Sequence, residues 1–334
     1  MNPPTEPIAT FSTTENDDED IQRYDQVEQW CRHEIAAGSD FLFDTIAFEA
    51  TMKRTSRDLQ FPLESLQSFF RNIYVQHIKS RSFQVKSQCN NYVEQYRQGR
   101  SILQLAQTAN FSPYLMARVI VENVAIIPDD KKKFLTAAMR DPMHYLGRVD
   151  CVRDEFLDIE HQWAAEEKER ISSATAPTRL ATEVKEAIDA DPLSGPRSDR
   201  AKHFVGIEFE VALEHMLRTR GIPFESETQL REKGTSKTPD VLLSCPIGVE
   251  VGSQWRIVNW IDSKALFGDV GTHQQSVLPQ CDSYINRFGP GMILYFFGHA
   301  PISMLGDANG DLVIMGWELP KRFMWPTGSI SDNS

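Results

Sequence analysis

Two apolar segments in the second half of the chain constrain its fold most. Val241–Leu243 follows Pro239-Asp240, and Arg256–Ile261 leads into Asp262-Ser263-Lys264. β-Branched and aromatic residues bounded by Pro and Gly are typical of strands. We therefore expect two strands here, joined by a connection that contains Pro and Gly.

The ends of these two strands carry polar side chains. Asp262 and Lys264 are two residues apart, so on a strand both project from the same face. With Asp240 at the start of the other strand, the three side chains meet at one edge of the sheet. Two carboxylates and one ammonium group suit a divalent cation and a positioned water. The simpler alternative is a solvated strand end, because a Pro-Asp turn and an Asp-x-Lys triplet also arise by chance.

The length and composition predict a folded chain. It has 334 residues, of which 41% are hydrophobic, enough for a sizeable core and two domains. It has no apolar run of the roughly 18 residues that a membrane helix needs, and its first residues do not form a secretory signal. The cysteines are odd in number and form no Cys-x-x-Cys pair, which indicates reduced thiols and argues against a zinc site. They are Cys31, Cys89, Cys151, Cys245 and Cys281.

The charge is unevenly distributed along the chain. The net charge is −12, but residues 1–50 carry −10, residues 51–150 carry +7, and residues 151–334 carry −9. Local potential, more than total charge, governs contact with phosphate. The basic central segment is therefore a candidate for nucleic-acid binding.

A helix-turn-helix motif is predicted inside this basic segment. A first helix over Ile102–Ala106 meets a short turn at Thr108–Phe111. Ser112 then caps a second helix whose first position is Pro113, and the small side chain of Ala106 allows the two helices to cross closely. The alternative is an ordinary helical hairpin.

The polar face of this motif is a candidate nucleic-acid surface. Its second helix presents Ser112, Tyr114 and Arg118. Further along, Lys131 and Lys132 are able to contact a backbone phosphate, although a lysine run is commonly a solvated helix start. We expect the helical region to bind the nucleic-acid backbone through these residues.

Changes in composition predict five successive regions. Residues 1–20 form a disordered acidic tail, and residues 21–150 form the helical region. Residues 151–200 form a linker with a surface insertion, because two charged helices there are broken by Ser- and Pro-rich segments. Residues 201–325 form the domain that contains the two strands, and residues 326–334 form a disordered polar tail.

A helix that carries three acidic residues precedes the two strands. Apolar residues recur at helical spacing over residues 204–217, and Gly221 ends the helix. Glu210 and Glu214 are four residues apart and share one face, whereas Glu208 points away. We favour Glu210 as the acid that turns toward the strand ends.

The order of elements resembles that of the PD-(D/E)xK nuclease superfamily. A helix over Gln274–Arg287 and a continuous apolar strand over Met292–Phe297 follow the two strands. The signature of that superfamily corresponds here to Pro239-Asp240 and Asp262-Ser263-Lys264. Gly206–Glu210, at the start of the acidic helix, is similar to the helix that supplies a further Glu in archaeal Holliday-junction resolvases.

The match is closer to one eukaryotic family, the codanin-interacting nucleases. It covers SPYLMARVIVE, the MRDP at 139–142, and Gly206 to about Gly298, and its strongest segments are LREKGTSKTPDVLL, NWIDSKALFGD and QCDSYINRFGPG. Residues 1–50 and about 155–190 fall outside the resemblance. It implies an α+β multidomain protein, in which an all-α helix-turn-helix region precedes an α/β restriction-endonuclease-like domain. That domain has a mixed central sheet flanked by helices.

The resemblance also implies roles for particular residues. Asp240, Asp262, the carbonyl of Ser263 and Glu210 correspond to ligands of Mg²⁺ or Mn²⁺, an ion that hard oxygen donors suit. Lys264 corresponds to the residue that orients or helps to deprotonate the attacking water and offsets charge in the transition state.

Three residues of the following helix region have less specific roles. Gln280 matches a Gln that contacts the phosphate or the attacking water in such nucleases. Arg287 is either structural or a phosphate contact. His273 either approaches the site or lies on the surface.

Three functions are consistent with these features. The first is a Mg²⁺- or Mn²⁺-dependent nuclease that acts on DNA, including structured DNA, or on RNA. The second is a weakly active nuclease-fold scaffold that binds nucleic acid and a codanin-like partner. The third is a transcription regulator, which would leave the acidic residues unused. In each case we expect an intracellular protein of the nucleus or cytoplasm with no membrane partner.

Overall fold

A computed structural model describes residues 17–171, 177–306 and 310–332 of the chain. The chain forms two compact units, each assembled from separate segments. The sheet unit consists of Met1–Cys31, Met52–Asn72 and Lys202–Ser334, and the helical unit consists of Arg32–Thr51 and Ile73–Ala201. Helices dominate the first half, and a mixed sheet with flanking helices forms in the second, which confirms the predicted α+β fold.

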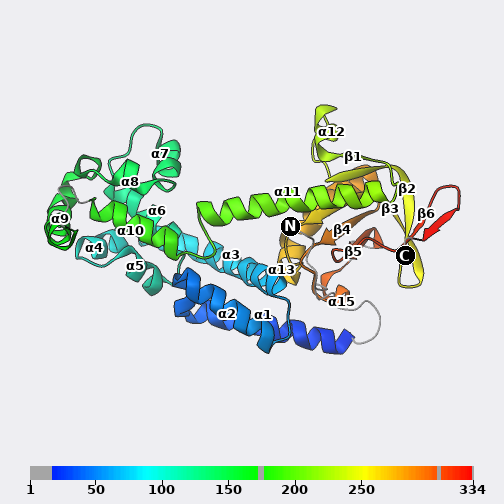
Figure 1. Ribbon diagram of the computed structural model, residues 1–334, viewed down its shortest axis with the longest axis horizontal. Helices are drawn as coiled ribbons and strands as arrows, with labels where there is room; N and C mark the ends of the chain where they lie inside the picture. The colour runs from blue at the N-terminus through cyan, green and yellow to red at the C-terminus, as the bar shows by residue number, and fades with distance from the viewer. Residues whose placement is uncertain (1–16, 172–176, 307–309, 333–334) are drawn as a thin grey trace. The chain divides into compact units, whose positions relative to one another are not determined.

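The described part of the sheet unit contains one sheet of seven strands (Figure 1). The strands lie in the order β5-β4-β3-β2-β6-β7, and β1 pairs with β2. The β3–β4 and β4–β5 pairs are parallel and the others are antiparallel. The strands are β1 (Phe224–Ser226), β2 (Val241–Val251), β3 (Gln254–Lys264), β4 (Gly291–Tyr295), β5 (Leu312–Met315), β6 (Arg322–Met324) and β7 (Ile330–Asp332).

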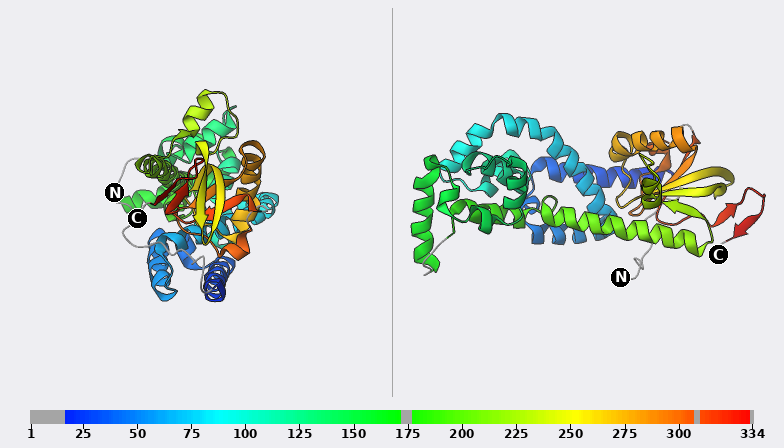
Figure 2. Two further views of the ribbon diagram at one scale, coloured as in Figure 1. Left: turned by 90° about the vertical axis from the view of Figure 1, so that its right-hand side faces the viewer. Right: turned by 90° about the horizontal axis from the view of Figure 1, so that it is seen from above.

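β2 and β3 are the two strands expected from the sequence, and they form a long hairpin, yellow in Figure 2. Gly252 lies in its two-residue turn with a φ of 60°, which glycine adopts at little cost. The register shifts between Leu242 and Ile247. Pro246 lies in this irregular stretch, where a residue without an N–H does not break a regular ladder.

Helices cover both faces of the sheet. α11 (Pro196–Thr219) buries Leu213 and Leu217 in the same core as Ile261 and Leu294, and it lies along one face of the sheet in Figure 1. α14 (Leu278–Phe288) follows α13 (Val270–Thr272) and the π-helix η4 (His273–Val277). α14 covers the opposite face, because Tyr284 packs edge-on against Trp260, with the ring centroids 5.2 Å apart.

Segments from the start of the chain complete the sheet unit. They come from α1 (Asp17–Ala37), α2 (Thr45–Asp58) and α3 (Leu63–Ser87). In α3, Phe69 stacks on Phe267 at 4.9 Å, and the Ser68 hydroxyl accepts a hydrogen bond from the Phe267 N–H. Residues 21–150 are therefore shared between the two units, which differs from the single helical region expected from the sequence.

The helical unit contains the expected pair of helices, α5 (Ile102–Ala109) and α6 (Pro113–Val124). Ser101 and Gln104 form a capping box at the start of α5, and Ser112 caps α6 through the Leu115 N–H. Asn110 ends α5 in the left-handed region, with a φ of 44°. The other helices include α4 (Cys89–Arg97), α7 (Lys131–Ala138), α8 (Pro142–Leu146), α9 (Leu157–Ile171) and α10 (Arg179–Ala190).

Residues 151–200 are not a surface linker. Leu180, Val184 and Ala187 of α10 are fully buried, and α10 packs against α5, α6 and α8. Charged side chains on α10 obscured its apolar face in the sequence. Arg179 and Glu183 are buried as an ion pair, with 2.6 Å between Nε and Oε1.

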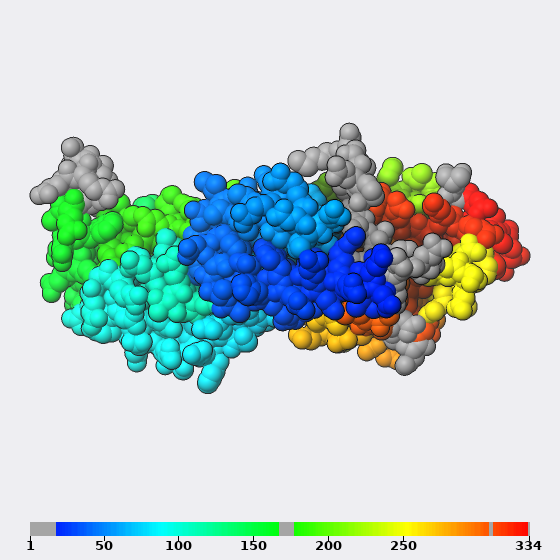
Figure 3. Space-filling model, turned by 90° about the horizontal axis from the view of Figure 1, so that it is seen from below, coloured from blue at the N-terminus to red at the C-terminus, as the bar shows by residue number. Residues whose placement is uncertain are grey.

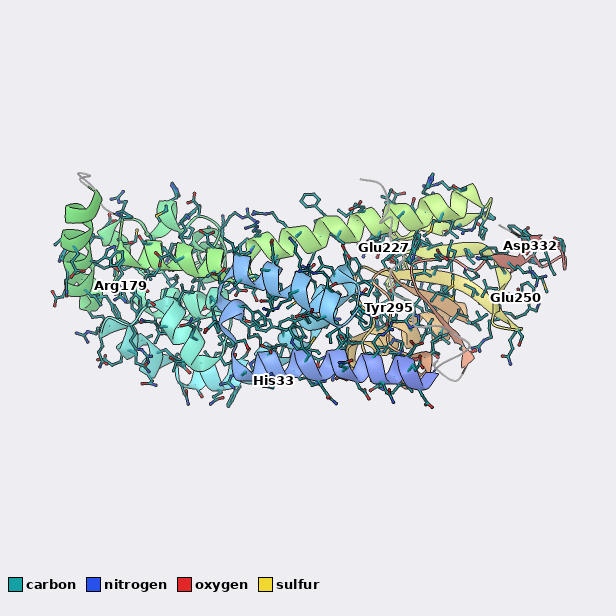
Figure 4. All side chains as sticks on the ribbon, turned by 60° about the horizontal axis from the view of Figure 1, so that its bottom comes forward. His33, Arg179, Glu227, Glu250, Tyr295 and Asp332 are labelled. Carbon is teal, nitrogen blue, oxygen red and sulfur yellow. The ribbon has the colours of Figure 1, made fainter. Side chains whose placement is uncertain are left out.

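The ends of the chain also differ from the expected tails. Ile330–Asp332 forms β7, which pairs with β6, so the stretch after residue 325 is partly ordered as a strand. Arg322 on β6 forms ion pairs with Glu250 and with Asp332. In Figure 3 the red atoms of the C-terminal segment lie beside the yellow atoms of the β2–β3 hairpin, and Figure 4 labels both acids.

At the other end of the chain, residues 1–16 of the expected acidic tail lie outside the described residues, while residues 17–20 begin α1. Among the helices of the described residues, we find none with the length and apolar character of a membrane span.

Candidate functional site

Asp240 is fixed at the start of β2 by its contacts with β3. Its Oδ2 accepts hydrogen bonds from the Ser263 N–H at 2.7 Å and from the Ser263 hydroxyl at 2.6 Å. The two strands therefore bring the Pro-Asp and Asp-Ser-Lys motifs together, although more than 20 residues separate them in the sequence. Asp240 remains partly exposed, so part of its carboxylate is available to solvent.

Asp262 and Lys264 form an ion pair beside Asp240. Both project from the face of β3 that α14 covers, and the Asp262 side chain is only 2% exposed. Burial raises the pKa of Asp262 to about 7, the Lys264 ammonium group opposes this shift, and the negative charge of Asp240 adds to it.

Lys264 is held in its charged form. Burial lowers the pKa of Lys264, but the charge of Asp262 and its hydrogen bond outweigh burial, so the pKa lies above its ordinary value. Lys264 is thus an ammonium donor at neutral pH. It is not poised to accept a proton.

Glu210 approaches Asp240 from the other side of the sheet. Burial raises the pKa of Glu210, and the charge of Asp240 raises it further. Phe209, its neighbour on α11, stacks on Phe296 with the ring centroids 4.2 Å apart, which places this part of α11 on the face opposite Asp262. Glu214 forms an ion pair with Arg218 on the same helix.

The acids divide between two faces, and this limits how they hold a metal. Within residues 17–171, 177–306 and 310–332, no three His, Cys, Asp or Glu side chains gather closely enough to ligate one ion. Asp240 and Asp262 offer two carboxylates, and the Ser263 carbonyl is a third oxygen donor. Mg²⁺ commonly binds through one or two carboxylates and retains several waters. The donor set therefore fits Mg²⁺ or Mn²⁺ with two direct carboxylates, with Glu210 further away.

Gln280 and Tyr284 connect α14 to the segment that carries Asp240. The Tyr284 hydroxyl donates to the Thr238 carbonyl at 2.9 Å and accepts from the Gln280 amide at 2.7 Å. Burial raises the pKa of Tyr284 to about 12, and the charge of Asp262 contributes. Gln280 is thus near the site but bonds to Tyr284. The sequence pattern gives Tyr284 no functional role, because its contact with Thr238 depends on how α14 packs.

A hollow of about 510 Å³ opens beside this segment. Gln280, Tyr284 and Thr238 line it, together with Lys237 and Arg231. Arg287 lies close by and donates to the Ser236 carbonyl, so in this structure it holds a backbone segment in place. Lys237 lies in the LREKGTSKTPDVLL segment, but no sequence pattern gave it a role.

His273 is fully buried under the sheet face that carries Lys264. Its Nδ1 lies 2.6 Å from the hydroxyl of Tyr295, the residue that pairs with Lys264 across β3 and β4. Burial lowers the pKa of His273 to about 4, so the ring is neutral at physiological pH. Of the two alternatives for His273, the surface position is wrong.

The predicted nucleic-acid residues of the helical unit differ in accessibility. Ser112 is fully buried and donates to Asp191 at 2.5 Å, so it is unavailable to a phosphate. Tyr114 is partly buried, and its N–H also donates to Asp191. Arg118 and Lys131 share Glu122 as an ion-pair partner, at 3.5 Å and 3.3 Å. Lys132 is exposed at the surface.

Comparison with known proteins identifies relatives that carry one name, CDAN1-interacting nuclease 1. The relative from Xenopus laevis is 34% identical over 200 residues, which cover 59% of this chain and 55% of that protein. The human relative is 32% identical over 254 residues, covering 72% of this chain and 78% of that protein. The zebrafish (Danio rerio) relative is 31% identical over 283 residues, covering 80% and 82%.

Two further comparisons place these matches in context. A family model described as a protein of unknown function with a TPD sequence motif matches residues 176–315, a range that includes Thr238-Pro239-Asp240. No solved structure matches the chain. The extent and identity of the human and zebrafish matches show that this chain belongs to the CDAN1-interacting nuclease 1 family.

Proposed function

We propose that the chain is a divalent-metal-dependent nuclease that hydrolyses phosphodiester bonds in DNA, including structured DNA, or in RNA. One observation carries the proposal: the Asp240 carboxylate is fixed against Ser263, beside the Asp262–Lys264 ion pair. The names of its relatives support a nuclease or nuclease-like role. The lysines at the start of α7, with Lys132 exposed, would hold the backbone of the same substrate.

The residues of the site suggest a division of roles. Asp240, Asp262 and the Ser263 carbonyl would hold Mg²⁺ or Mn²⁺, which when bound neutralises phosphate charge and lowers the pKa of a coordinated water. Lys264 stays protonated, so it would stabilise the negative charge that develops on the phosphate rather than accept a proton. Ser263 donates two hydrogen bonds to Asp240 and so fixes the orientation of its carboxylate.

Glu210 would act at longer range. It lies on the opposite face of the sheet from Asp262, and its pKa responds to Asp240. A carboxylate in this position would hold a water or an ion-bound water rather than the ion itself. Gln280 is held by Tyr284 and would reach a phosphate only from the neighbouring hollow.

A second candidate function is a nuclease-fold scaffold that binds a CDAN1-like partner with little turnover. The observation that favours it is the division of the acids between two faces, which leaves fewer direct metal ligands than a three-carboxylate site has. The relatives are named for an interaction with CDAN1. Under either function the chain would act inside the cell, in the nucleus or cytoplasm.

A cleavage assay distinguishes the two functions. Purified full-length protein is incubated with labelled duplex, single-stranded, flap and junction DNA and with RNA, in Mg²⁺, Mn²⁺ or EDTA. We expect metal-dependent cleavage that falls roughly 10²-fold or more in Asp240→Ala and Lys264→Ala. Asp282→Ala and Lys321→Ala remove the same charges from exposed positions of the sheet unit and should cut normally. Binding without cleavage of any substrate would support the scaffold.

A further inference from the structure

We propose that the hollow beside Asp240 is a subsite for a backbone phosphate of the substrate strand, with Lys237 as its principal charged contact. The proposal rests on the proposed nuclease function and extends it by naming where a phosphate next to the cleaved one would bind. The hollow has a volume of about 510 Å³, which exceeds what one phosphate group requires and leaves room for the adjoining sugar.

The hollow and the candidate metal ligands share one backbone segment. Thr238, in the wall of the hollow, is two residues before Asp240. Tyr284 also lines the hollow, and its hydroxyl donates to the Thr238 carbonyl at 2.9 Å. A strand whose cleaved phosphate lies at Asp240 would therefore place a neighbouring phosphate in or near this hollow.

The lining of the hollow suits an anion. Lys237 and Arg231 contribute two cationic side chains, and Ser283 and Gln280 contribute neutral donors. Among the described residues that line it, Glu227 is the acid, and its Oε1 already accepts from Arg231 at 2.6 Å and from the Thr238 hydroxyl at 3.2 Å. One positive charge therefore remains available, and it belongs to Lys237.

The backbone at Lys237 has an unusual conformation, and hydrogen bonds fix the residues on either side of it. Lys237 has a φ of 52°, in the left-handed region that residues with a Cβ rarely adopt and that is enriched at functional sites. Both neighbours are held in place, since Arg287 donates to the Ser236 carbonyl and Tyr284 donates to the Thr238 carbonyl. Lys237 itself is exposed, and the structure gives it no ion pair with any described residue.

The local charge explains why such a subsite would be needed. Residues 202–334 carry 15 acidic and 11 basic side chains, a net charge of −4, and Asp240, Asp262 and Glu210 place part of that negative charge where a phosphate must arrive. A positive rim lowers the electrostatic barrier for an incoming anion. Lys237 supplies that rim within three residues of Asp240.

The test compares full-length variants in binding an oligothymidylate, measured by fluorescence anisotropy in EDTA at several salt concentrations. Lys237→Gly removes the ammonium group and keeps the positive φ, and Lys237→Arg keeps the charge. Lys321→Ala removes one exposed lysine from the same unit as the matched control. We expect Lys237→Gly to weaken binding about 3–10-fold and to reduce the slope of log K against log salt by about 0.7, the value for one single-strand phosphate contact. Lys237→Arg should restore both, and Lys321→Ala should change neither.

Two outcomes overturn the subsite. In the first, Lys237→Gly binds with the affinity and salt slope of Lys321→Ala. In the second, inorganic phosphate at high concentration competes equally well with the oligothymidylate on wild type and on Lys237→Gly, which would place the phosphate contact elsewhere.

Failure of the subsite is distinguishable from failure of the nuclease function. If wild type cuts DNA with Mg²⁺ and Lys237→Gly has the same KM and Kd, the subsite is wrong and the nuclease stands. If wild type cleaves no substrate and Lys237→Gly still binds more weakly with a smaller salt slope, the subsite is correct. It then belongs to a nucleic-acid-binding protein that lacks nuclease activity.

Discussion

Both units bury charged side chains, but they use them differently. In the helical unit, Glu160 accepts from the N–H groups of Arg179 and Leu180 at 2.6 and 3.1 Å, and Glu183 accepts from the Ile102 N–H at 2.8 Å. Arg179 in turn donates to Glu183 and to two backbone carbonyls, and its guanidinium group lies over the Tyr96 ring. This network, labelled at Arg179 in Figure 4, uses its hydrogen-bonding capacity internally.

In the sheet unit, Asp240 leaves part of its hydrogen-bonding capacity unused. Asp240 bonds Ser263 through one oxygen, and Asp262 bonds Lys264 through one oxygen. Asp240 therefore retains a second oxygen for a ligand, whereas Asp262 also accepts a hydrogen bond from the Asp240 N–H and is almost fully buried. The comparison indicates that a buried charge with every partner inside the protein stabilises the fold, whereas one with spare acceptors next to solvent is a candidate for chemistry.

The largest effect on stability is expected in the helical unit. Arg179→Met leaves Glu160 and Glu183 without their cation, and breaking a buried pair typically costs about 3–5 kcal/mol. Thermal and urea unfolding should show this loss. Lys185→Ala removes a solvent-exposed pair with Asp189 on the same helix and should cost no more than about 1 kcal/mol. Equal losses in the two variants would contradict the structural role of the network.

The pH dependence of stability tests the same network. Burial raises the pKa of Glu160, so the folded state binds its proton more tightly than the unfolded state does. The contribution of Glu160 to the free energy of unfolding therefore falls as the pH rises from the ordinary carboxyl pKa through the raised pKa of the folded state. In Glu160→Gln that contribution is absent, so the stability of wild type relative to the variant should decline across this range. A pH-independent difference would show that burial does not raise the pKa of Glu160.

A smaller effect is expected where α14 supports the Asp240 segment. Tyr284→Phe removes the hydroxyl between Gln280 and the Thr238 carbonyl, and we expect a loss of about 0.5–1.5 kcal/mol in stability. Because Tyr284 positions Asp240, kcat should fall while KM for the nucleic acid changes little. If cleavage is unchanged while stability falls, Tyr284 only supports the fold.

The smallest effect is expected on the surface of the helical unit. Lys132→Ala should reduce the salt slope of duplex binding by up to about 0.9, the value for one phosphate contact. Arg118→Ala should have less effect, because Arg118 already shares Glu122 with Lys131. Anisotropy titrations at several salt concentrations measure both slopes. A larger reduction of the salt slope in Arg118→Ala than in Lys132→Ala would contradict this order.

Local sequence patterns predicted a large part of the fold. Strand composition identified β2 and β3, and Ser112 with Pro113 marked the start of α6. Asp240 and the Asp262–Lys264 pair were predicted to meet, because strand pairing brings these motifs to one edge. These features depend on neighbouring residues and on simple pairing.

Features that depend on packing between distant segments could not be predicted. α10 appeared to be a charged surface helix, because its buried Arg179 meets Tyr96 and Glu160 only in the folded unit. The burial of Ser112 likewise depends on Asp191, 79 residues away. β7 is a strand because β6 is beside it, and the polar sequence of β7 gave no sign of this.

Binding of Mn²⁺ to the full-length protein tests the central claim most directly. The claim is that the carboxylates of Asp240 and Asp262 hold a divalent cation. Titration followed by electron paramagnetic resonance should show one site in wild type, weakened by more than roughly 10-fold in Asp240→Asn, with Asp282→Asn as the exposed control. Equal binding by wild type and Asp240→Asn would contradict the account.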